Sequence, residues 1–390
     1  MSALFQTYPP FPFLLDHGSG DRVFAADGRS WYDFYGGHCV ASTGHGHPEV
    51  VDAIAAQARR LLFYSTAGEM QIRHAAADAL LSFAAGVGLE KVFFCNSGAE
   101  ANENALKIAH QLTGRSRVLS TIGGWHGRTL GCLAVTDDPA IVEPQAGWLL
   151  PNAKIPFNDL AALDQVPWEQ FAAVIVEPVQ SMSGIKVATP EWLQALAARA
   201  KSHRVLLILD EIQTGVGRLG TPFAAHHYGI RPDLLSSAKG LASGVPVGAL
   251  LMTGAIAQAL KPKDLGSTFG GSPLACAALL ATLEVIGAAQ LPARATELAS
   301  RIRTGLAGNP AIRGVRGLGL LLGLECVQAQ ALKAYLFDHG ILLGGSSDPE
   351  VLRLMPPLTL SDAAVAALLD ACGGFAAAAS SRVSLGEASA

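Results

Sequence analysis

Charged residues are scarce in this chain of 390 residues. Asp, Glu, Lys and Arg make up 15% of it, and 28 basic residues against 32 acidic ones give a formal net charge of −4. A protein that binds nucleic acid through the phosphate backbone needs a strongly basic surface. The composition therefore argues against nucleic acid as a partner.

Cysteine pairs and membrane-spanning runs are also missing. The six cysteines are dispersed without a C-x-x-C pair, which argues against a zinc ribbon, a thioredoxin-type site and a disulfide framework. No uncharged apolar run has the length of a membrane span. Residues 1–15 hold three prolines and no basic cluster, so we expect no signal peptide and no membrane partner. The expected location is the reducing cytoplasm.

Hydrophobic residues and glycine are abundant by contrast. Half of the chain is hydrophobic and it holds 42 glycines, a composition that suits an α/β enzyme with many tight loops. Short apolar runs alternate with helix-like stretches from residue 44 to residue 286. Strands buried on both faces belong to mostly parallel sheets. The expected strands are residues 91–95, 118–122, 172–176, 205–209 and 250–252, with a helix over residues 99–112.

The last hundred residues follow another pattern. We expect an amphipathic helix over residues 291–306, strands over 320–325 and 352–355, and a helix over 361–371 with Ser361 as its N-cap. The sequence thus predicts a large α/β domain over residues 44–286. A smaller α+β domain is expected from both chain ends, residues 1–43 and 287–375, with a flexible tail over 376–390.

Two residues with opposite charges stand at the ends of apolar segments. Asp210 follows five apolar residues, which places it at the carboxyl end of a buried strand. Lys239 lies among small residues, where its amine is accessible and burial lowers its pKa. An isolated Asp at such a place is more often a helix cap or an ion-pair partner, and Lys239 alone could be a surface residue. Their combination indicates a site.

Three loops complete this pattern. Residues 96–98 form a strand-to-helix junction suited to an anion, although Ser97 could be an ordinary N-cap. Residues 266–271 are small and rich in hydroxyls. Trp125 follows two glycines and offers a face for stacking, unless it is a core residue. A phosphate cradle, an aromatic platform, a carboxylate and an accessible lysine together describe a pyridoxal phosphate site.

In this order and spacing the segments resemble a family. From residue 27 to residue 358 the chain is similar to the class III (ω-amino-acid) aminotransferases, which implies the fold of type I pyridoxal-phosphate enzymes. The matching segments are residues 97–103 (SGAEANE), 125–129 (WHGRT), 177–180 (EPVQ), 210–218 (DEIQTGVGR), 237–240 (SAKG), 266–271 (GSTFGG), and Arg353 with 356–358 (PPL).

The resemblance implies a role for individual residues. Lys239 matches the lysine that bonds covalently to the cofactor and moves the substrate proton, and Asp210 matches the partner of the pyridine nitrogen. Thr268 resembles a phosphate ligand supplied by the other subunit, which implies a homodimer with shared active sites. The expected cofactor-binding residues are Ser97, Gly98, Ala99, Trp125, His126, Asp210, Gln213, Lys239, Ser267 and Thr268.

Two arginines are expected to bind substrate carboxylates. By resemblance, Arg128 binds the carboxylate of an ω-amine donor and Arg353 binds the α-carboxylate of glutamate or 2-oxoglutarate, unless either forms a structural ion pair. The family usually has a glutamate two residues after the position of Gln180, where it masks the Arg353 position. This chain has Met182 there. We therefore expect Arg353 to stay unmasked.

The resemblance also implies a reaction. The expected activity is a ping-pong transfer of an ω-amino group, with N2-acetylornithine as the favoured donor, to 2-oxoglutarate in arginine biosynthesis. Succinylornithine, ornithine, 4-aminobutyrate and lysine-pathway donors stay open, because pockets separate neighbouring substrates by only about 1–3 kcal/mol. Two other interpretations are a decarboxylating or aminomutase relative and a catalytically silent cofactor-binding protein. The intact Lys239, Asp210 and Gln213 argue against a silent protein.

Two other patterns are weaker. Residues 215–220 spell G-x-G-x-x-G, but a dinucleotide site needs a helix to begin there, and Pro222 and Gly229 argue against one. The pairs His45/His47 and His226/His227 lack the i, i+4 spacing of a helical metal site. We expect neither a nicotinamide dinucleotide nor a metal.

Overall fold

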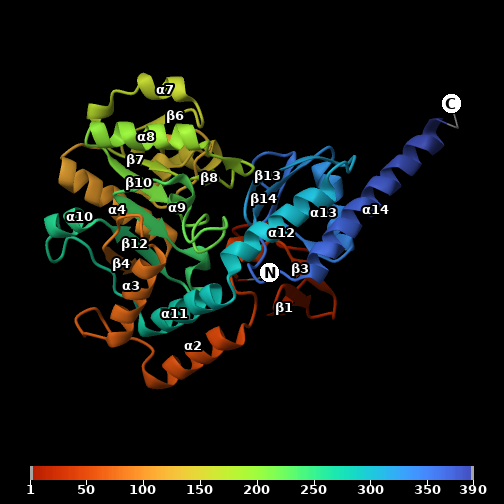
Figure 1. Cartoon of the computed structure of the whole chain (residues 1–390), viewed down its shortest axis with the longest axis horizontal. Coiled ribbons are helices and arrows are strands. Elements are labelled where there is room, and N and C mark those ends of the chain that lie inside the picture. The colour runs from red at the N-terminus through yellow and green to blue at the C-terminus, as the bar shows by residue number, and fades with distance from the viewer. Residues whose placement is uncertain (1–2, 388–390) are drawn as a thin grey trace.

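A seven-stranded sheet forms the centre of the larger part of the molecule (Figure 1). The computed structural model describes residues 3–387, with side-chain burial through residue 378. The strand order is β4-β12-β11-β10-β7-β5-β6, and β12 alone runs antiparallel to its two neighbours. The strands are β4 (Lys91–Cys95), β5 (Arg117–Thr121), β6 (Asn152–Ile155), β7 (Phe171–Val176), β10 (Leu206–Asp210), β11 (Leu234–Ser237) and β12 (Gly248–Met252).

Both faces of this sheet are buried, because successive side chains of a strand point to opposite faces. On β10, Ile208 packs with α4 (Gly98–Thr113), whereas Leu207 and Leu209 pack in a second cluster with α8 (Pro190–Ser202). Burial on both faces explains why these strands are apolar throughout. The predicted mostly parallel sheet is confirmed. Strands β6 and β11 were not predicted, because β6 is a short edge strand and half of β11 is serine.

Two smaller sheets form the other part of the molecule. One has the order β1-β2-β3-β15, and the other is the antiparallel set β13-β14-β16. In the first, Ile341 of β15 pairs with Tyr32 of β3, so both chain ends share one sheet. The strands are β1 (Leu15–Ser19), β2 (Arg22–Ala25), β3 (Ser30–Asp33), β13 (Ile312–Leu318), β14 (Leu321–Cys326), β15 (Ile341–Leu342) and β16 (Val351–Leu354). The domain boundaries at residues 44 and 287 stay a prediction.

Helix α14 (Asp362–Glu387) begins where the sequence predicted a helix. The Ser361 hydroxyl accepts a hydrogen bond from the Ala364 amide at 3.1 Å, as expected for an N-cap. The helix continues far beyond residue 371, so residues 376–387 of the predicted tail are helical, and it extends away from the rest of the molecule (Figure 1). Gly373 and Gly374 do not end it, since the alanines that follow favour a helix.

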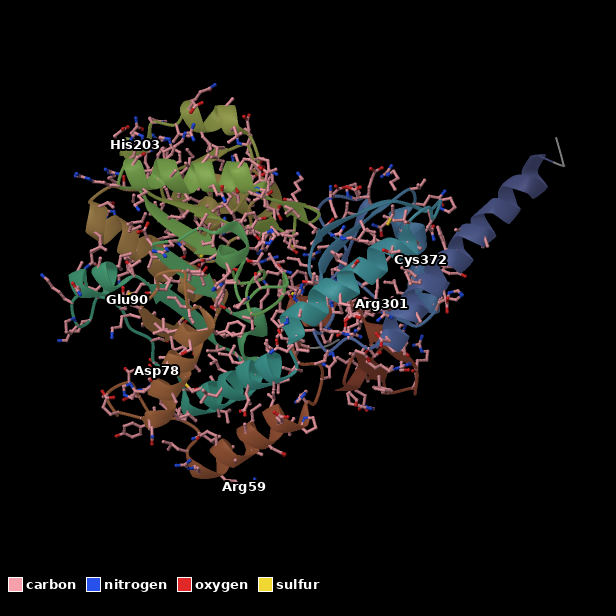
Figure 2. All side chains as sticks on the ribbon, viewed as in Figure 1. Arg59, Asp78, Glu90, His203, Arg301 and Cys372 are labelled. Carbon is pink, nitrogen blue, oxygen red and sulfur yellow. The ribbon has the colours of Figure 1, made fainter. Side chains whose placement is uncertain are left out.

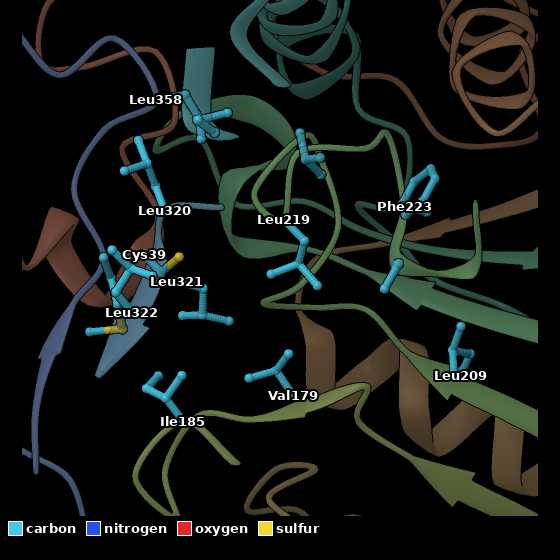
Figure 3. Packing of buried hydrophobic residues seen from close by; sticks show 14 of the residues in the cluster. Cys39, Val179, Ile185, Leu209, Leu219, Phe223, Leu320, Leu321, Leu322 and Leu358 are labelled. Carbon is cyan, nitrogen blue, oxygen red and sulfur yellow. The ribbon is translucent and has the colours of Figure 1, made fainter. Parts of the chain in front are cut away.

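One apolar core runs through both parts of the molecule. Figure 3 shows Val179 and Leu219 of the larger part facing Leu320, Leu321 and Leu358 of the smaller part. Charged side chains such as those labelled Arg59, Asp78, Glu90 and Arg301 in Figure 2 are exposed. A large apolar interface restrains the two parts relative to each other.

The remaining elements are helices and short strands. Gly36–Cys39 (α1) is a turn whose four residues have φ between 56° and 67°. The others are α2 (Pro48–Arg60), α3 (Gln71–Phe83), α5 (Leu130–Val135), α6 (Pro139–Val142), η1 (Glu143–Trp148), α7 (Leu160–Asp164), η2 (Trp168–Gln170), β8 (Val179–Gln180), β9 (Lys186–Val187), α9 (Ala224–Tyr228), η3 (Lys239–Ala242), α10 (Gly254–Ala259), α11 (Pro273–Ala288), α12 (Leu291–Leu306) and α13 (Ala329–Asp338).

Within the described residues, no single helix combines the length and apolar character needed to cross a membrane. Helices α11 and α12 meet that criterion only as a pair, and they are bent by 61° where they join.

Candidate active site

Most of the predicted site residues lie at one edge of the central sheet. Asp210 ends β10, Lys239 follows β11, Ser97 follows β4 and Trp125 follows β5. The carboxyl ends of parallel strands meet at one edge, which is where open α/β sheets bind ligands. A cavity of about 390 Å³ opens there and is lined by Ser97, Gly98, Ala99, Trp125, His126, Asp210, Gln213 and Lys239, among others.

Three donors hold the Asp210 carboxylate, which is only 3% exposed. Its Oδ2 accepts a hydrogen bond from Asn102 Nδ2 at 2.8 Å and lies 2.8 Å from His126 Nδ1. Its Oδ1 accepts from the Ile212 amide at 3.1 Å. The carboxylate is therefore fixed in orientation at the bottom of the cavity.

Lys239 lies on the turn η3 in a strained backbone conformation, with φ of 41°. A left-handed residue other than glycine or asparagine persists only where its surroundings fix it. Gly240 packs so closely that a Cβ there would lie 2.1 Å from Ser42 Oγ. Desolvation in the cavity lowers the pKa of Lys239, and the negative charge of Asp210 opposes this shift. The result is a lysine amine that can act as a nucleophile and base.

The start of α4 lies at the cavity. Ser97 is its N-cap, and the Ser97 Oγ accepts a hydrogen bond from the Glu100 amide at 3.1 Å. The amides of Gly98 and Ala99 belong to the first turn, where helix N–H groups lack partners within the helix. Ser97 thus caps the helix, as one interpretation expected, and it also lines the cavity; its role in binding an anion stays a prediction.

Trp125 is half-buried and lines the cavity, so it is not a core residue. Its amide donates to Glu177 Oε1 at 2.7 Å. Burial raises the pKa of Glu177 to about 7, although the nearby His126 favours its charged form. Gln213 also lines the cavity, and its Nε2 lies 3.1 Å from the Met355 sulfur.

These residues fit pyridoxal phosphate. The cavity offers one amine, one fixed carboxylate, one aromatic face and one helix N-terminus, which are the four groups that this cofactor requires. Two buried polar atoms beside Asp210, His126 Nε2 and Asn102 Oδ1, have no hydrogen-bond partner among the described residues.

The two arginines lie in different surroundings. Arg128 is exposed; its Nη2 donates to the Tyr8 hydroxyl at 3.3 Å, and its guanidinium lies 5.2 Å from the Trp125 ring centre. Arg353 is only 4% exposed and comes from β16. Its Nε donates to Gly345 O at 2.5 Å and its Nη1 donates to Ser181 Oγ at 3.0 Å. Burial lowers the pKa of Arg353.

Two predicted cofactor residues do not reach this cavity. Ser267 Oγ accepts hydrogen bonds from Asn96 Nδ2 and the Gly270 amide, both at 3.1 Å. Thr268 is exposed on the surface, next to Phe269, which is 58% exposed. Neither Ser267 nor Thr268 therefore lines the cavity of its own chain, although Ser267 accepts a hydrogen bond from Asn96, which does.

The two weaker patterns have structural explanations. Turns follow Gly215, and the next helix, α9, begins only at Ala224. His45 Nε2 lies 2.8 Å from Asp33 Oδ2, and His226 Nε2 lies 3.0 Å from Ala85 O. Among residues 3–378, no group of three or more His, Cys, Asp or Glu side chains is arranged to hold a metal ion.

Sequence reasoning gave no role to two residues of the site. Glu177 follows the buried strand β7 directly, which is the same signal that singled out Asp210. Asn102 is fully buried inside α4 and bridges Asp210 to His126 O, with both bonds at 2.8 Å. Its position in the middle of a helix gives no sign of this role.

Comparison with known proteins shows the family of this chain. The model of the family described as aminotransferase class-III matches residues 5–373. The acetylornithine aminotransferase of Streptomyces coelicolor is 42% identical over 367 residues, which cover 93% of this chain and 90% of that protein. The acetylornithine aminotransferase of Methanothermobacter thermautotrophicus is 36% identical, with 95% of both chains covered.

Solved structures agree as well. The ornithine aminotransferase of Toxoplasma gondii ME49 superposes with a TM-score of 0.90 at 30% identity, covering 97% of this chain and 94% of that one. The acetylornithine aminotransferase of Elizabethkingia anophelis gives 0.82 at 31% identity, with 95% of both chains covered. Another structure of the Toxoplasma gondii enzyme holds pyridoxal phosphate at its active site with partial occupancy. This chain belongs to the class III aminotransferases, which are enzymes that depend on pyridoxal phosphate.

Proposed function

We propose that this enzyme transfers the ω-amino group of N2-acetylornithine to 2-oxoglutarate in two half-reactions that share one cavity. The observation that carries the proposal is the cavity itself, in which a lysine amine, a fixed carboxylate and a helix N-terminus face one space. The choice of donor rests on eight relatives with 36 to 42% identity, all named acetylornithine aminotransferase.

Each residue of the cavity has a proposed task. Pyridoxal phosphate, when bound, supplies an electron sink for the carbon that loses its proton. Lys239 would anchor the cofactor covalently and would then move a proton between a substrate carbon and a second atom. Asp210, which Asn102 and His126 orient, would pair with the ring nitrogen. Trp125 would offer its aromatic face to the ring.

Other groups bind the rest of the cofactor. The amides of Gly98 and Ala99 and the Ser97 hydroxyl bind the phosphate at the start of α4. Gln213 contacts the ring hydroxyl. Ser267 and Thr268 serve the cavity of a second subunit, which is supported by their absence from the lining of their own cavity and by the exposure of Thr268. The enzyme is accordingly proposed to be a homodimer with shared sites.

The arginines bind the substrates. Arg128 is exposed at the aromatic rings of Tyr8 and Trp125 and receives the donor carboxylate. Arg353 is buried beside Ser181 and receives the α-carboxylate of 2-oxoglutarate. Met182 cannot form an ion pair with Arg353, and none of the ion pairs among the described residues involves Arg353.

The cellular setting follows the sequence. We propose a cytoplasmic enzyme of arginine biosynthesis, because its six cysteines are all buried and free, which suits a reducing compartment.

The test is the visible absorbance of the holoenzyme. Adding acetylornithine alone should bleach the cofactor band, and adding 2-oxoglutarate should restore it. Half-reaction rates should rank acetylornithine above succinylornithine, ornithine, 4-aminobutyrate and lysine. A higher rate with ornithine or 4-aminobutyrate would reject the proposed donor, and no bleaching with any amine would reject the aminotransferase activity.

A further inference from the structure

Residues 181–184 form a turn that the smaller part of the molecule holds beside Arg353. We call it the 181–184 turn. Ser347 donates twice to Met182 O, from its amide and from its hydroxyl, both at 2.8 Å. Arg316 Nε donates to Gly184 O at 2.6 Å. With the bond from Arg353 to Ser181, three of the four residues of the turn are bound by the smaller part.

The same turn is bound to the larger part. Ser183 Oγ donates to Gly123 O at 2.6 Å, two residues before Trp125. Gly123 has φ of 80°, and a Cβ there would lie 2.6 Å from Ser183 Oγ, so the two segments pack without space between them. The 181–184 turn thus connects Arg353 with the segment that leads to Trp125.

The residue after the turn is fixed by packing. Ile185 is fully buried with φ of 58°, a conformation that β-branched residues rarely adopt. It lies close to Leu322 and Val179 in Figure 3. A Cβ on Gly317 or Gly323 would come within 3.0 or 3.1 Å of it. Such a backbone persists only where the surroundings fix it, so the position of the turn is defined by its neighbours.

Arg316 also forms ion pairs with the acidic side chains of this region. Its Nη1 lies 3.1 Å from Glu325 Oε1 and its Nη2 lies 3.0 Å from Asp348 Oδ2. Asp348 belongs to the loop whose Gly345 carbonyl accepts the bond from Arg353 Nε. Arg316 therefore pairs with two acidic side chains of the region, while Arg353 keeps two neutral acceptors.

We infer that Arg316 is a positioning residue for the α-carboxylate of the acceptor substrate. It holds the 181–184 turn through Gly184 and pairs with Asp348 and Glu325. Ser181 then orients the Arg353 guanidinium, which stays available to a substrate carboxylate. The inference rests on the proposed role of Arg353 and adds a residue that does not itself touch the substrate.

The test compares Arg316→Ala and Arg316→Lys with the control Arg313→Ala. Arg313 lies on the same strand and binds Glu350 and Cys326 O, away from the turn. For each purified holoenzyme, kcat, the KM of each substrate and the melting temperature are measured. In a ping-pong enzyme each substrate takes part in its own half-reaction, so the KM of each substrate describes one half-reaction.

Arg316→Ala should raise the KM for 2-oxoglutarate about tenfold, as expected when a charged hydrogen bond that orients a ligand group is lost. The kcat and the KM for the amino donor should stay within about twofold of the wild-type values. A change of that size is smaller than the change expected when one hydrogen bond to the substrate is lost. Arg316→Lys should raise the KM for 2-oxoglutarate by less than Arg316→Ala does. A lysine can pair with Asp348 but cannot also donate a hydrogen bond to Gly184 O. Arg313→Ala should change none of these constants.

Equal effects of Arg316→Ala and Arg313→Ala, or a fall in kcat with both KM values moving together, would overturn the inference. Arg353→Gln separates this failure from that of the proposed function. If Arg353→Gln leaves the KM for 2-oxoglutarate unchanged, the proposed role of Arg353 is wrong. If it raises this KM and the Arg316 variants do not, only the inference is wrong. If Arg316→Ala does not fold, Arg316→Lys and Ser347→Ala decide by the same criteria.

Discussion

At the scale of single residues, the partly exposed Lys239 and the buried Arg353 differ in their partners. Lys239 lies in the cavity with Asp210 and Glu177 nearby, and desolvation lowers its pKa most. Arg353 is bound by a carbonyl and a hydroxyl. Lysine loses its proton readily when buried, whereas arginine stays charged. The lysine can therefore exchange a proton and the arginine can only bind an anion.

Lys239→Ala should abolish the covalent attachment of the cofactor. Loss of a positioned acid–base group lowers the rate by about 10²- to 10⁴-fold, and loss of the covalent anchor adds to this. The measurement is borohydride reduction of the holoenzyme followed by mass spectrometry of the intact chain. Lys201→Ala, on the exposed side of α8, is the control and should keep both the reducible link and the activity. Cofactor mass retained on Lys239→Ala would contradict the assignment.

Glu177 predicts a pH dependence of stability. Burial raises its pKa from 4.5 to about 7, so between these values the folded chain holds a proton that the unfolded chain has lost. The free energy of unfolding should therefore fall as the pH rises through this window. Glu177→Gln should reduce this fall by about 1–3 kcal/mol.

Urea unfolding of the cofactor-free protein between about pH 5 and pH 8 measures this effect. Glu169→Gln is the control, because Glu169 is exposed beside His203 and its pKa is lowered, so it titrates below this range. An unchanged slope in Glu177→Gln would show that Glu177 ionises normally.

At the scale of elements, the start of α4 has two functions that can be measured separately. Ser97 caps the helix through the Glu100 amide and lines the cavity. Thr189 caps α8 in the same way, accepting from the Trp192 amide at 3.4 Å, away from the cavity. The two caps form a matched pair.

Ser97→Ala and Thr189→Ala should each lower the free energy of unfolding by about 0.5–2 kcal/mol. Ser97→Ala alone should also weaken pyridoxal phosphate binding by about tenfold or more, because a donor to a charged group is lost. Titration of the cofactor-free protein with pyridoxal phosphate and with pyridoxal distinguishes the two effects. Equal losses for both ligands would place the phosphate elsewhere.

The sequence predicted well the elements that are buried on all sides, because such positions require apolar residues. Strands such as β7 are buried on both faces and must be apolar throughout, so their bounds and the polar residues that follow them could be predicted. The short strands β1 to β3 are only four or five residues long; β1 has no buried position, and β2 and β3 alternate between partly exposed and buried positions, so their pattern resembles a loop. Glu177 carried the same signal as Asp210 but no partner residue drew attention to it. The role of Asn102 depends on tertiary contacts alone.

At the scale of the whole molecule, the cavity contains only part of the predicted cofactor set. Thr268 and Phe269 lie exposed at the surface, although the loop of residues 266–271 was predicted to bind phosphate. An exposed Thr268 is the arrangement expected if this loop serves a neighbouring subunit, as proposed above. The sequence resemblance placed Thr268 in the site of a second subunit, but a single sequence shows neither that contact nor its geometry.

Mixing two inactive or weakened subunits tests this arrangement. In a heterodimer of Lys239→Ala and Thr268→Ala subunits, the site that keeps Lys239 receives an intact Thr268 from the other subunit. That site should regain wild-type affinity for pyridoxal phosphate, improved about tenfold over the Thr268→Ala homodimer. Cofactor titration of separated heterodimers measures it. No gain over the Thr268→Ala homodimer would show that Thr268 does not act across subunits.

The pairing of β3 with β15 has a consequence for synthesis of the chain. Tyr32 pairs with Ile341, so β3 emerges from the ribosome long before its partner strand is made. At about 5–20 residues per second this interval is on the order of 15–60 s. During that time β3 presents an open edge, which is a template for pairing with other chains. The nascent chain is therefore prone to aggregate through β3 until β15 has been synthesised. We expect a chaperone that covers β1 to β3 during translation to raise the yield of folded enzyme.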